Sequence, residues 1–390
     1  MASEQRLEIK ENLRISLQQE TLVNVMQNNS SIFYTGIVVA LDQGGVIMTT
    51  YTEDGLANGY VYLTYQDIFD VDFESDDLAK MEQRIQMAQR LKLIDAQPVP
   101  YQLNQKVALL TQVLGTALVE QQALLLTLQD GTMLEGFVTA VERDHVKLRT
   151  FDKFDNREAG QRQLDQHQIC SAEFLGTELR LLGQSHSLLF RPHLEPLSET
   201  TSLKIFAILN RACENGQRVI MVPKLKPELF FIGQVRAVNA NAAVFAVVDM
   251  NGLFGGYELI RLDEIGQVII KSDYLRLLNH FVGLNLSQGT YRQPLLNDER
   301  AFDKTVDLFQ MILEQSRRFK RLVRIKLTDG TAYFGLPIRS RQPGELGLRY
   351  FDEDDPLISK RKRFRCSEVV EIAFDYLDAE LTKQQFLGHH

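Results

Sequence analysis

The stretch LLLTLQDGTMLEGFVTAVERDHVKL, residues 124–148, decides the fold of this 390-residue chain. Asp130-Gly131 is a strong hairpin signal between two apolar runs. The second run, residues 133–141, contains Gly136, and a glycine inside a strand marks a bend or a bulge. A turn at Arg143-Asp144 then leads into a third apolar run, residues 146–151. The stretch therefore predicts three consecutive antiparallel strands, of which the second is bent.

The bent strand recurs four times, at a spacing of about 100 residues. Its glycine is Gly36, Gly136, Gly233 and Gly335. Fifteen or sixteen residues after the glycine an apolar residue precedes a polar one: Tyr51-Thr52, Phe151-Asp152, Val248-Asp249 and Phe351-Asp352. An apolar run closes 37 to 39 residues after the glycine, at Phe73, Phe174, Ile270 and Phe374. A period this long indicates tandem small domains, because solenoid repeats have periods of roughly 20–50 residues.

The repeat predicts four domains, at residues 1–96, 97–192, 193–290 and 291–390. Each reads as helix, strands, helix, so the expected class is mainly β with helices (α+β), as four tandem small β-barrels. Closing each barrel would remove sheet edges that invite pairing with other chains. We expect helices at 75–93, 103–121, 201–214, 274–286 and 298–318, turns at 28–30 and 226–227, and linkers at 97–100, 191–199 and 287–294.

The composition is that of an ordinary globular protein, with 44% hydrophobic and 24% charged residues. No apolar stretch reaches the roughly 20 residues of a membrane span, and residues 1–10 lack a signal-peptide core. The three cysteines are too few for a disulfide framework. We therefore expect a cytoplasmic protein without a membrane partner.

Residues 124–148 resemble an Sm-like (LSm) domain, in which a helix precedes five strands and the second strand bends at a glycine. Residues 323–335, VRIKLTDGTAYFG, resemble the same domain. The first and third repeats resemble it mainly because they share the landmarks of the internal repeat. The resemblance implies four Sm-like or SH3-like barrels. Since Sm-like domains assemble by pairing barrel edges, it also implies a ring or arc built from these units.

The nucleotide pocket of the Sm family does not carry over. The family has an Asp six residues after the glycine and an Asn four residues further on. The first place is taken here by Asp42, Glu142, Asn239 and Arg341, and the second by Val46, Val146, Ala243 and Glu345. No repeat has the Asn, and the Arg-Gly or Lys-Gly motif before the last strand is also missing.

Charge sets the fourth repeat apart. Residues 317–365 hold fourteen Lys and Arg against six Asp and Glu, a local balance of +8 in a chain of net charge −8. One basic cluster precedes the first strand of this repeat, and a second lies in its last loop. Their residues are Arg317, Arg318, Lys320, Arg321, Lys360, Arg361, Lys362, Arg363 and Arg365. Interleaved Phe319 and Phe364 offer faces on which bases stack.

Two functions follow from these features. The first is a non-enzymatic protein-interaction scaffold, in which the basic clusters pair with acidic surface of the earlier repeats or of a second chain. The second is an RNA-binding or RNA-regulatory protein that uses the basic clusters. We expect no catalytic site, cofactor or metal: His167 and Cys170 lack a second pair of zinc ligands, and the run Asp352-Glu-Asp-Asp355 reads as a solvated loop.

Overall fold

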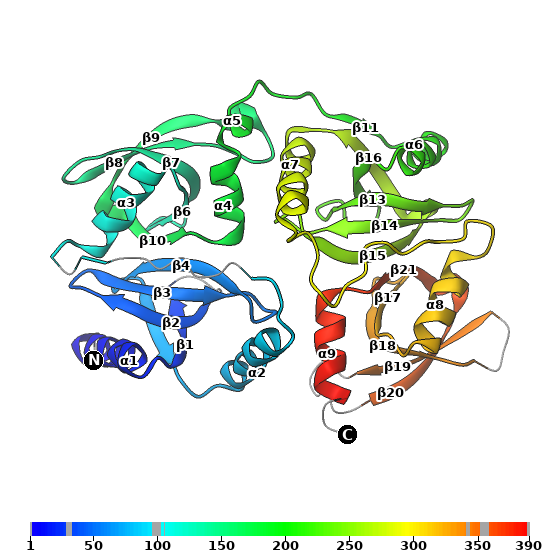
Figure 1. The fold of residues 1–390 in the computed structure, drawn as a ribbon, viewed down its shortest axis with the longest axis horizontal. Helices are drawn as coiled ribbons and strands as arrows, with labels where there is room; N and C mark the ends of the chain where they lie inside the picture. Colours follow the sequence, from blue (N-terminus) through cyan, green and yellow to red (C-terminus); the bar gives the residue numbers. More distant parts are fainter. Residues whose placement is uncertain are drawn as a thin grey trace. The chain divides into compact units, whose positions relative to one another are not determined.

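The computed structural model divides into two compact units, unit 1 (Met1–His193) and unit 2 (Leu194–His390). The structure describes residues 2–28, 33–95, 103–104, 106–340, 344–351 and 359–387. Both units combine antiparallel strands with helices, so the α+β class is confirmed (Figure 1). None of the helices in these residues is long and apolar enough to cross a membrane. The expected turn at 28–30 and linker at 97–100 fall wholly or partly outside the described residues.

Unit 1 contains one sheet of ten strands in the order β5-β1-β2-β3-β4-β10-β6-β7-β8-β9. Its strands are β1 (Leu22–Gln27), β2 (Phe33–Leu41), β3 (Gly45–Tyr51), β4 (Ala57–Thr64), β5 (Ile68–Asp72), β6 (Ala123–Leu128), β7 (Met133–Val141), β8 (His145–Thr150), β9 (Gly160–Asp165) and β10 (Ile169–Phe174). Its helices are α1 (Ala2–Gln19), α2 (Asp76–Arg90), α3 (Leu109–Glu120), α4 (Thr177–Gln184) and α5 (His186–Leu189).

Unit 2 contains one sheet of eleven strands in the order β11-β16-β12-β13-β14-β15-β21-β17-β18-β19-β20. Its strands are β11 (Leu197–Glu199), β12 (Arg218–Pro223), β13 (Phe231–Val238), β14 (Ala242–Val248), β15 (Phe254–Arg261), β16 (Ile265–Lys271), β17 (Val323–Leu327), β18 (Ala332–Ile338), β19 (Glu345–Phe351), β20 (Ser359–Arg365) and β21 (Val369–Phe374). Its helices are α6 (Ser202–Glu214), α7 (Asp273–Gln288), α8 (Leu308–Arg318) and α9 (Leu377–Leu387).

The four repeat-defining glycines occupy matching places in these sheets. Each lies on a strand that follows a hairpin, opposite a buried apolar residue: the pairs are Val23–Gly36, Leu124–Gly136, Val219–Gly233 and Val323–Gly335. A Cβ atom at any of the four would lie within 3.0 Å of a carbonyl oxygen on the next strand, that of Thr49, Arg149, Ala246 or Arg349. The glycine is therefore required by this close approach of two backbones.

A helix covers each of these bent strands. In Figure 1, α1, α3, α6 and α8 each lie beside a sheet, and they contact β2, β7, β13 and β18 respectively. The apolar faces of the first three helices enter cores that also contain the strands, as Leu13, Val113 and Leu209 show. This burial explains why the sequence has helical periodicity directly before each bent strand.

The hydrogen bonding corrects the expectation that each repeat closes on itself and so leaves no sheet edge. In unit 1, β4 pairs with β3 on one side and with β10 on the other, while β5, within the described residues, pairs with β1 alone. In unit 2, β15 pairs with β14 and β21. In the part of the chain that the structure describes, each sheet is consequently open, runs through two of the predicted repeats and ends in free edges.

Several predicted boundaries were wrong for local reasons. The helices expected at 103–121 and 298–318 begin at Leu109 and Leu308. Before them, the side chains of Asn104 and Asp303 accept backbone N–H bonds two residues further on, at 3.0 and 2.9 Å, and such turns compete with a helix. The linker expected at 191–199 contains strand β11, which pairs with β16.

Candidate interaction surfaces

In each unit one strand pairing joins the two predicted repeats: we call β4–β10 of unit 1 joint 1 and β15–β21 of unit 2 joint 2. They have the same register, because Tyr60 lies opposite Phe174 and Tyr257 opposite Phe374. In both joints the two rings stack, with centroids 5.5 and 5.3 Å apart and interplanar angles of 19° and 16°. All four aromatic side chains are buried, so each joint has an apolar centre.

A glycine next to the tyrosine allows the partner chain to come close. Gly59 and Gly256 have φ angles of +82° and +102°, a region that side chains rarely adopt. A Cβ at Gly59 would meet the backbone of Leu175, and one at Gly256 would meet Asp375 and Tyr376. The segment after the joint phenylalanine therefore packs directly on the backbone before the joint tyrosine.

Joint 1 also contains a half-buried polar pair. Tyr34 Oη on β2 donates a hydrogen bond of 2.7 Å to Glu173 Oε1 on β10. Burial, with Glu173 nearby, raises the pKa of the Tyr34 hydroxyl, and burial likewise raises the pKa of Glu173. The bond connects the second strand of one repeat with the fifth strand of the next.

Joint 2 holds two carboxyl groups instead. Glu258 and Glu371 are both about 4% exposed. Lys326 Nζ lies 3.3 Å from Glu371, and Arg324 lies 3.9 Å from Glu258 and 4.0 Å from Glu371. Burial, and then the neighbouring Glu371, raise the pKa of Glu258 well above its usual range. Glu258 is thus held as a neutral acid at a pH where exposed glutamates are charged.

The first basic cluster of the sequence analysis is largely engaged in contacts within unit 2. Arg317 and Arg318 lie in the last turn of α8, where Arg317 pairs with Glu314 at 2.5 Å. Arg321 pairs at 2.6 Å with Asp375, which is 3% exposed and also binds Arg300 at 2.5 Å. Lys320 is exposed and has a φ of +51°. Of these residues, Arg321 serves the structure rather than a ligand.

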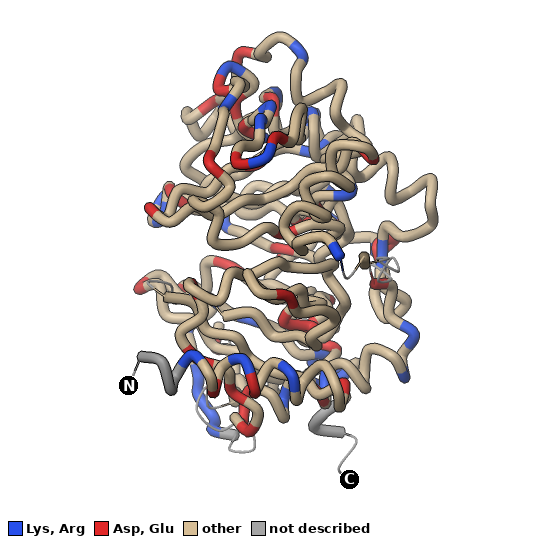
Figure 2. The backbone as a smooth tube through the Cα atoms, turned by 90° about the vertical axis from the view of Figure 1, so that its left-hand side faces the viewer, with Lys and Arg blue, Asp and Glu red and all other residues tan. Residues whose placement is uncertain are grey.

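The second basic cluster forms an edge strand, not the loop that we expected. Residues Lys360 to Arg365 belong to β20, which pairs along its whole length with β19 and ends the sheet of unit 2. The four consecutive basic residues Lys360 to Arg363 form the continuous blue segment near the bottom of Figure 2. The loop 352–358, which contains the predicted acidic run Asp352 to Asp355, lies outside the described residues.

The two faces of β20 differ. On one face Phe364 is buried, and Lys362 contacts the Tyr333 hydroxyl with its Nζ 4.3 Å from the centre of the Tyr333 ring. On the other face Arg361 lies directly opposite Arg349 of β19. Like charges in this position destabilise a sheet, and neither guanidinium makes an ion pair with any described residue. This face therefore favours an anionic partner.

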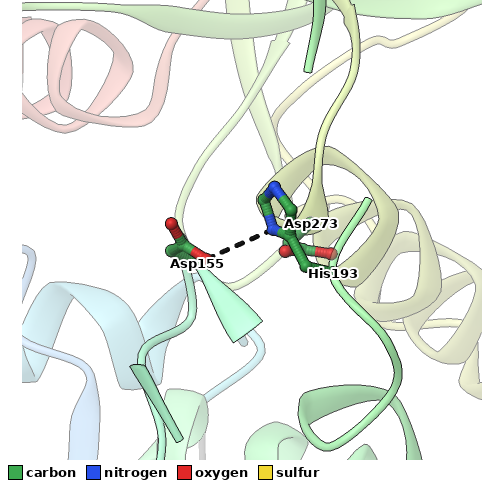
Figure 3. A group of neighbouring side chains, drawn as sticks. All are labelled: Asp155, His193 and Asp273. Atoms are coloured by element: carbon green, nitrogen blue, oxygen red, sulfur yellow. Dashed lines mark ion pairs between the residues drawn. The ribbon is translucent and has the colours of Figure 1, made fainter. Parts of the chain in front are cut away.

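Figure 3 draws Asp155 and His193 of unit 1 and Asp273 of unit 2. In unit 1, His193 Nδ1 lies 3.2 Å from Asp155 Oδ1, and Asp155 also pairs with Arg157 at 2.6 Å. In unit 2, Asp273 accepts a 3.1 Å bond from the Leu194 N–H and pairs with Arg276 at 2.7 Å. Each carboxylate is thus already bound by a guanidinium, which opposes a metal ion there.

Among the described residues, neither His167 nor Cys170 belongs to a group of three or more side chains that could hold a metal ion. Burial, together with the neighbouring Asp67, raises the pKa of the Cys170 thiol to about 11. A hollow beside α8 in unit 2 carries both signs of charge, from Arg261, Arg317, Arg339, Asp307, Glu314 and Glu345.

No protein-family model matches the chain, and no curated protein matches it. Among solved structures, a DNA polymerase III subunit beta sliding clamp from Bartonella birtlesii matches with 11% sequence identity over 93% of this chain and 81% of that chain. Its TM-score is 0.11, so this likeness carries no argument about fold or function.

The sequence singled out the bent-strand glycines and both basic clusters, but it missed the joints. A signal was present, because the dipeptide Gly-Tyr occurs at 59–60 and again at 256–257. In both places the tyrosine stands 24 residues after the bent-strand glycine, Gly36 or Gly233. The missing information was that these tyrosines face a phenylalanine more than 100 residues away.

Proposed function

We propose that this protein is a non-enzymatic interaction scaffold built from four Sm-like modules, residues 1–96, 97–192, 193–290 and 291–390. The matching glycines, helices and strand orders support four modules of one type. In this reading each module has the strand order 5-1-2-3-4, and the fourth strand of one module pairs with the fifth strand of the next. The proposal assigns the protein no catalytic residue, cofactor or metal.

The observation that carries this proposal is the pair of joints. Strand pairing between modules gives main-chain hydrogen bonds with little dependence on side chains, and a pocket for one aromatic pair adds specificity. The outer edges of β5, β9 and β20, which we call the free edges, have no strand partner in the described part of the chain, and the fourth sheet end, β11, has only three residues. A protein with a suitable strand would extend either sheet there.

The test is to find where a bound protein lies. The full chain would be immobilised and exposed to a nuclease-treated cell extract, and the retained protein purified and mixed with the chain. We expect amide hydrogen exchange to slow in β5, β9 or β20 and to stay unchanged in α4 and α7. Slowing confined to segments other than the three free edges, or retention of no protein, would contradict the scaffold.

A second candidate, RNA binding, rests on the opposed pair Arg349 and Arg361. Phosphate groups on this face would relieve the repulsion between them, and Arg363 and Arg365 follow on the same face of β20. A contact of this kind releases counterions, so affinity for RNA should fall about tenfold to a thousandfold between 50 and 200 mM salt. Filter binding measures this directly.

The variants for this test follow from the contacts. Arg361→Glu with Arg363→Glu should abolish RNA binding, whereas Arg143→Glu, on an exposed turn of unit 1, should leave it unchanged. Arg317→Glu shows whether the first cluster takes part. Absence of binding at 50 mM salt by the unaltered chain would exclude this candidate.

A further inference from the structure

We propose that a second copy of this chain is one partner of the scaffold, and that the copies associate head to tail by antiparallel pairing of β20 of one copy with β5 of the next. The inference rests on the proposed function, because it names the partner of two of the free edges. Three observations carry it: the register of the joints, the charges that this register brings together, and a tyrosine hydroxyl beside β20 that donates to no described carboxylate.

The free edges are of two kinds. β9 and β20 hold the place that β4 and β15 hold in the joints, since each pairs with the strand after a bent strand. β5 and β16 hold the place of β10 and β21, since each pairs with the strand before a bent strand. β11 covers the outer edge of β16, so in the described residues β5 alone offers the second kind of edge.

The place of the joint tyrosine on β20 is taken by Arg361. Tyr60 lies opposite Thr49, whose carbonyl oxygen faces a bent-strand glycine, and Tyr257 lies opposite a residue of the same kind. On β19 the residue whose carbonyl oxygen faces the glycine is Arg349, and it lies opposite Arg361. Lys362 follows Arg361 toward the end of the strand.

The place of the joint phenylalanine is taken by Phe73. In joint 1 the residue before the phenylalanine is Glu173, which lies opposite Leu125 of β6. Asn24 occupies the same place in β1, and it lies opposite Asp72 of β5. Asp72 therefore corresponds to Glu173, and the next residue, Phe73, to the stacked phenylalanine.

Pairing β20 with β5 in the register of the joints puts Arg361 opposite Phe73 and Lys362 opposite Asp72. In the first pair the Arg361 guanidinium takes the place of the joint tyrosine ring over the phenylalanine, and a guanidinium stacks on an aromatic ring with similar geometry. The second is a pair of opposite charges directly across two strands, which is stabilising. Four basic residues of β20, at positions 361, 362, 363 and 365, would then meet an edge that carries Asp70 and Asp72.

A hydrogen-bonding group beside β20 also fits this partner. In joint 1, Tyr34 stands two residues before its glycine and donates to Glu173. Tyr333 stands two residues before Gly335, and among the described residues its hydroxyl meets Lys362 and no carboxylate. A carboxylate in the place of Glu173 would complete this group, and in the proposed pairing that carboxylate is Asp72.

The other free edge of the first kind is β9, and it is the rival. It retains a glycine, Gly160, where the joints have Gly59 and Gly256, whereas β20 has Lys360 there. We therefore expect pairing along β20 to stop at Arg361. However, the place of Tyr34 is taken here by Leu134 of β7, so β9 has no tyrosine hydroxyl beside it. The charged residues of β9 are Arg162 and Asp165, so it also lacks the basic run.

The test uses chains with one cysteine each on the opposing edges. Lys362→Cys and Asp72→Cys are made separately, both with Cys366→Ser because Cys366 is the exposed native thiol. Residues directly opposite in an antiparallel pair have Cβ atoms about 5 Å apart, close to disulfide range. Mixing the two chains under mild oxidation should give a covalent dimer, twice the 44.6 kDa of one chain.

Two controls keep the result specific. Arg162→Cys on β9, mixed with Asp72→Cys, should give no dimer above background; an equal yield would assign the contact to β9 and overturn the proposal. The second control is a chain that carries both Lys362→Cys and Asp72→Cys. If this chain crosslinks only within itself, and the mixed single variants do not crosslink, the two strands pair within one chain and the proposal is overturned.

A charge exchange tests the same contact without oxidation. Light scattering across concentration should show that Lys362→Glu and Asp72→Lys each weaken association about tenfold, and that the chain carrying both substitutions recovers it. Recovery also shows that both variants fold. A chain that is monomeric at every concentration would overturn this inference but leave the scaffold to its own test, because the free edges would still be open to another protein.

Discussion

Replacing Glu258 by Gln should remove a pH-dependent weakness of joint 2. Glu258 and Glu371 lie buried on the paired strands β15 and β21, and Oε1 of Glu258 has no hydrogen-bond partner among the described residues. An amide has the shape of the protonated acid and donates toward Glu371 as that acid would. Since the amide carries no ionisable proton, the variant keeps the neutral form at every pH.

The sign follows from the raised pKa. The folded protein holds the Glu258 proton more tightly than the unfolded chain, whose glutamates titrate near 4.5. The stabilisation that this proton gives the folded protein is therefore fully present below about pH 4.5, and it is lost as the pH rises toward the folded pKa. One retained proton changes the free energy of unfolding by at most about 1.4 kcal/mol per pH unit, so about 3 kcal/mol between pH 5 and 7.5.

We thus expect Glu258→Gln to match the unaltered protein at pH 5 and to be more stable by about 1–3 kcal/mol at pH 7.5. Hydrogen exchange in peptides covering 254–261 and 369–374 reports the joint itself, and urea unfolding reports the whole chain. Glu299→Gln, on the surface of the same unit, is the matched control. A variant less stable than the unaltered protein at both pH values would refute the reasoning.

Two further predictions concern backbone contact and buried charge. Gly335→Ala should destabilise unit 2 by about 1–3 kcal/mol, because the added Cβ would collide with the Arg349 carbonyl. Gly115→Ala, in open space on α3, should instead stabilise unit 1 by about 0.5–1 kcal/mol. Thermal unfolding measures both effects, and equal effects would contradict the close approach at Gly335. Asp375→Asn should lower the free energy of unfolding by about 3–5 kcal/mol, since it removes the charged partner that Arg300 and Arg321 share. A melting temperature within about 2 °C of that of the unaltered protein would exclude that role.

The strands and most helices were predictable because their signals are local. The Asp-Gly turns, the glycine inside each second strand and the helical periodicity before it all act within about fifteen residues, and β7 has the bounds 133–141 that the sequence indicates. The module boundaries and the resemblance to Sm-like domains remain predictions. The basic clusters were found from charge alone.

The joints and the edge position of β20 could not be predicted in this way. They depend on which strands meet across more than 100 residues, and neither hydropathy nor turn chemistry specifies a distant partner. Lys360 to Arg365 read as a loop because five of six residues are charged, yet an edge strand exposes one side and tolerates such a sequence. The alternation that identifies strands was hidden by basic residues on both faces.

The long separation of the strands in joint 1 has a consequence for synthesis of the chain. β4 leaves the ribosome about 105 residues before β10, its partner. At roughly 5–20 residues per second, the edge of β4 waits about 5–20 s for that strand. Tyr60 and Tyr62, buried in the finished joint, lack the strand that lies opposite them throughout this interval. The period of greatest risk for pairing between nascent chains thus falls while residues 65–168 are being translated.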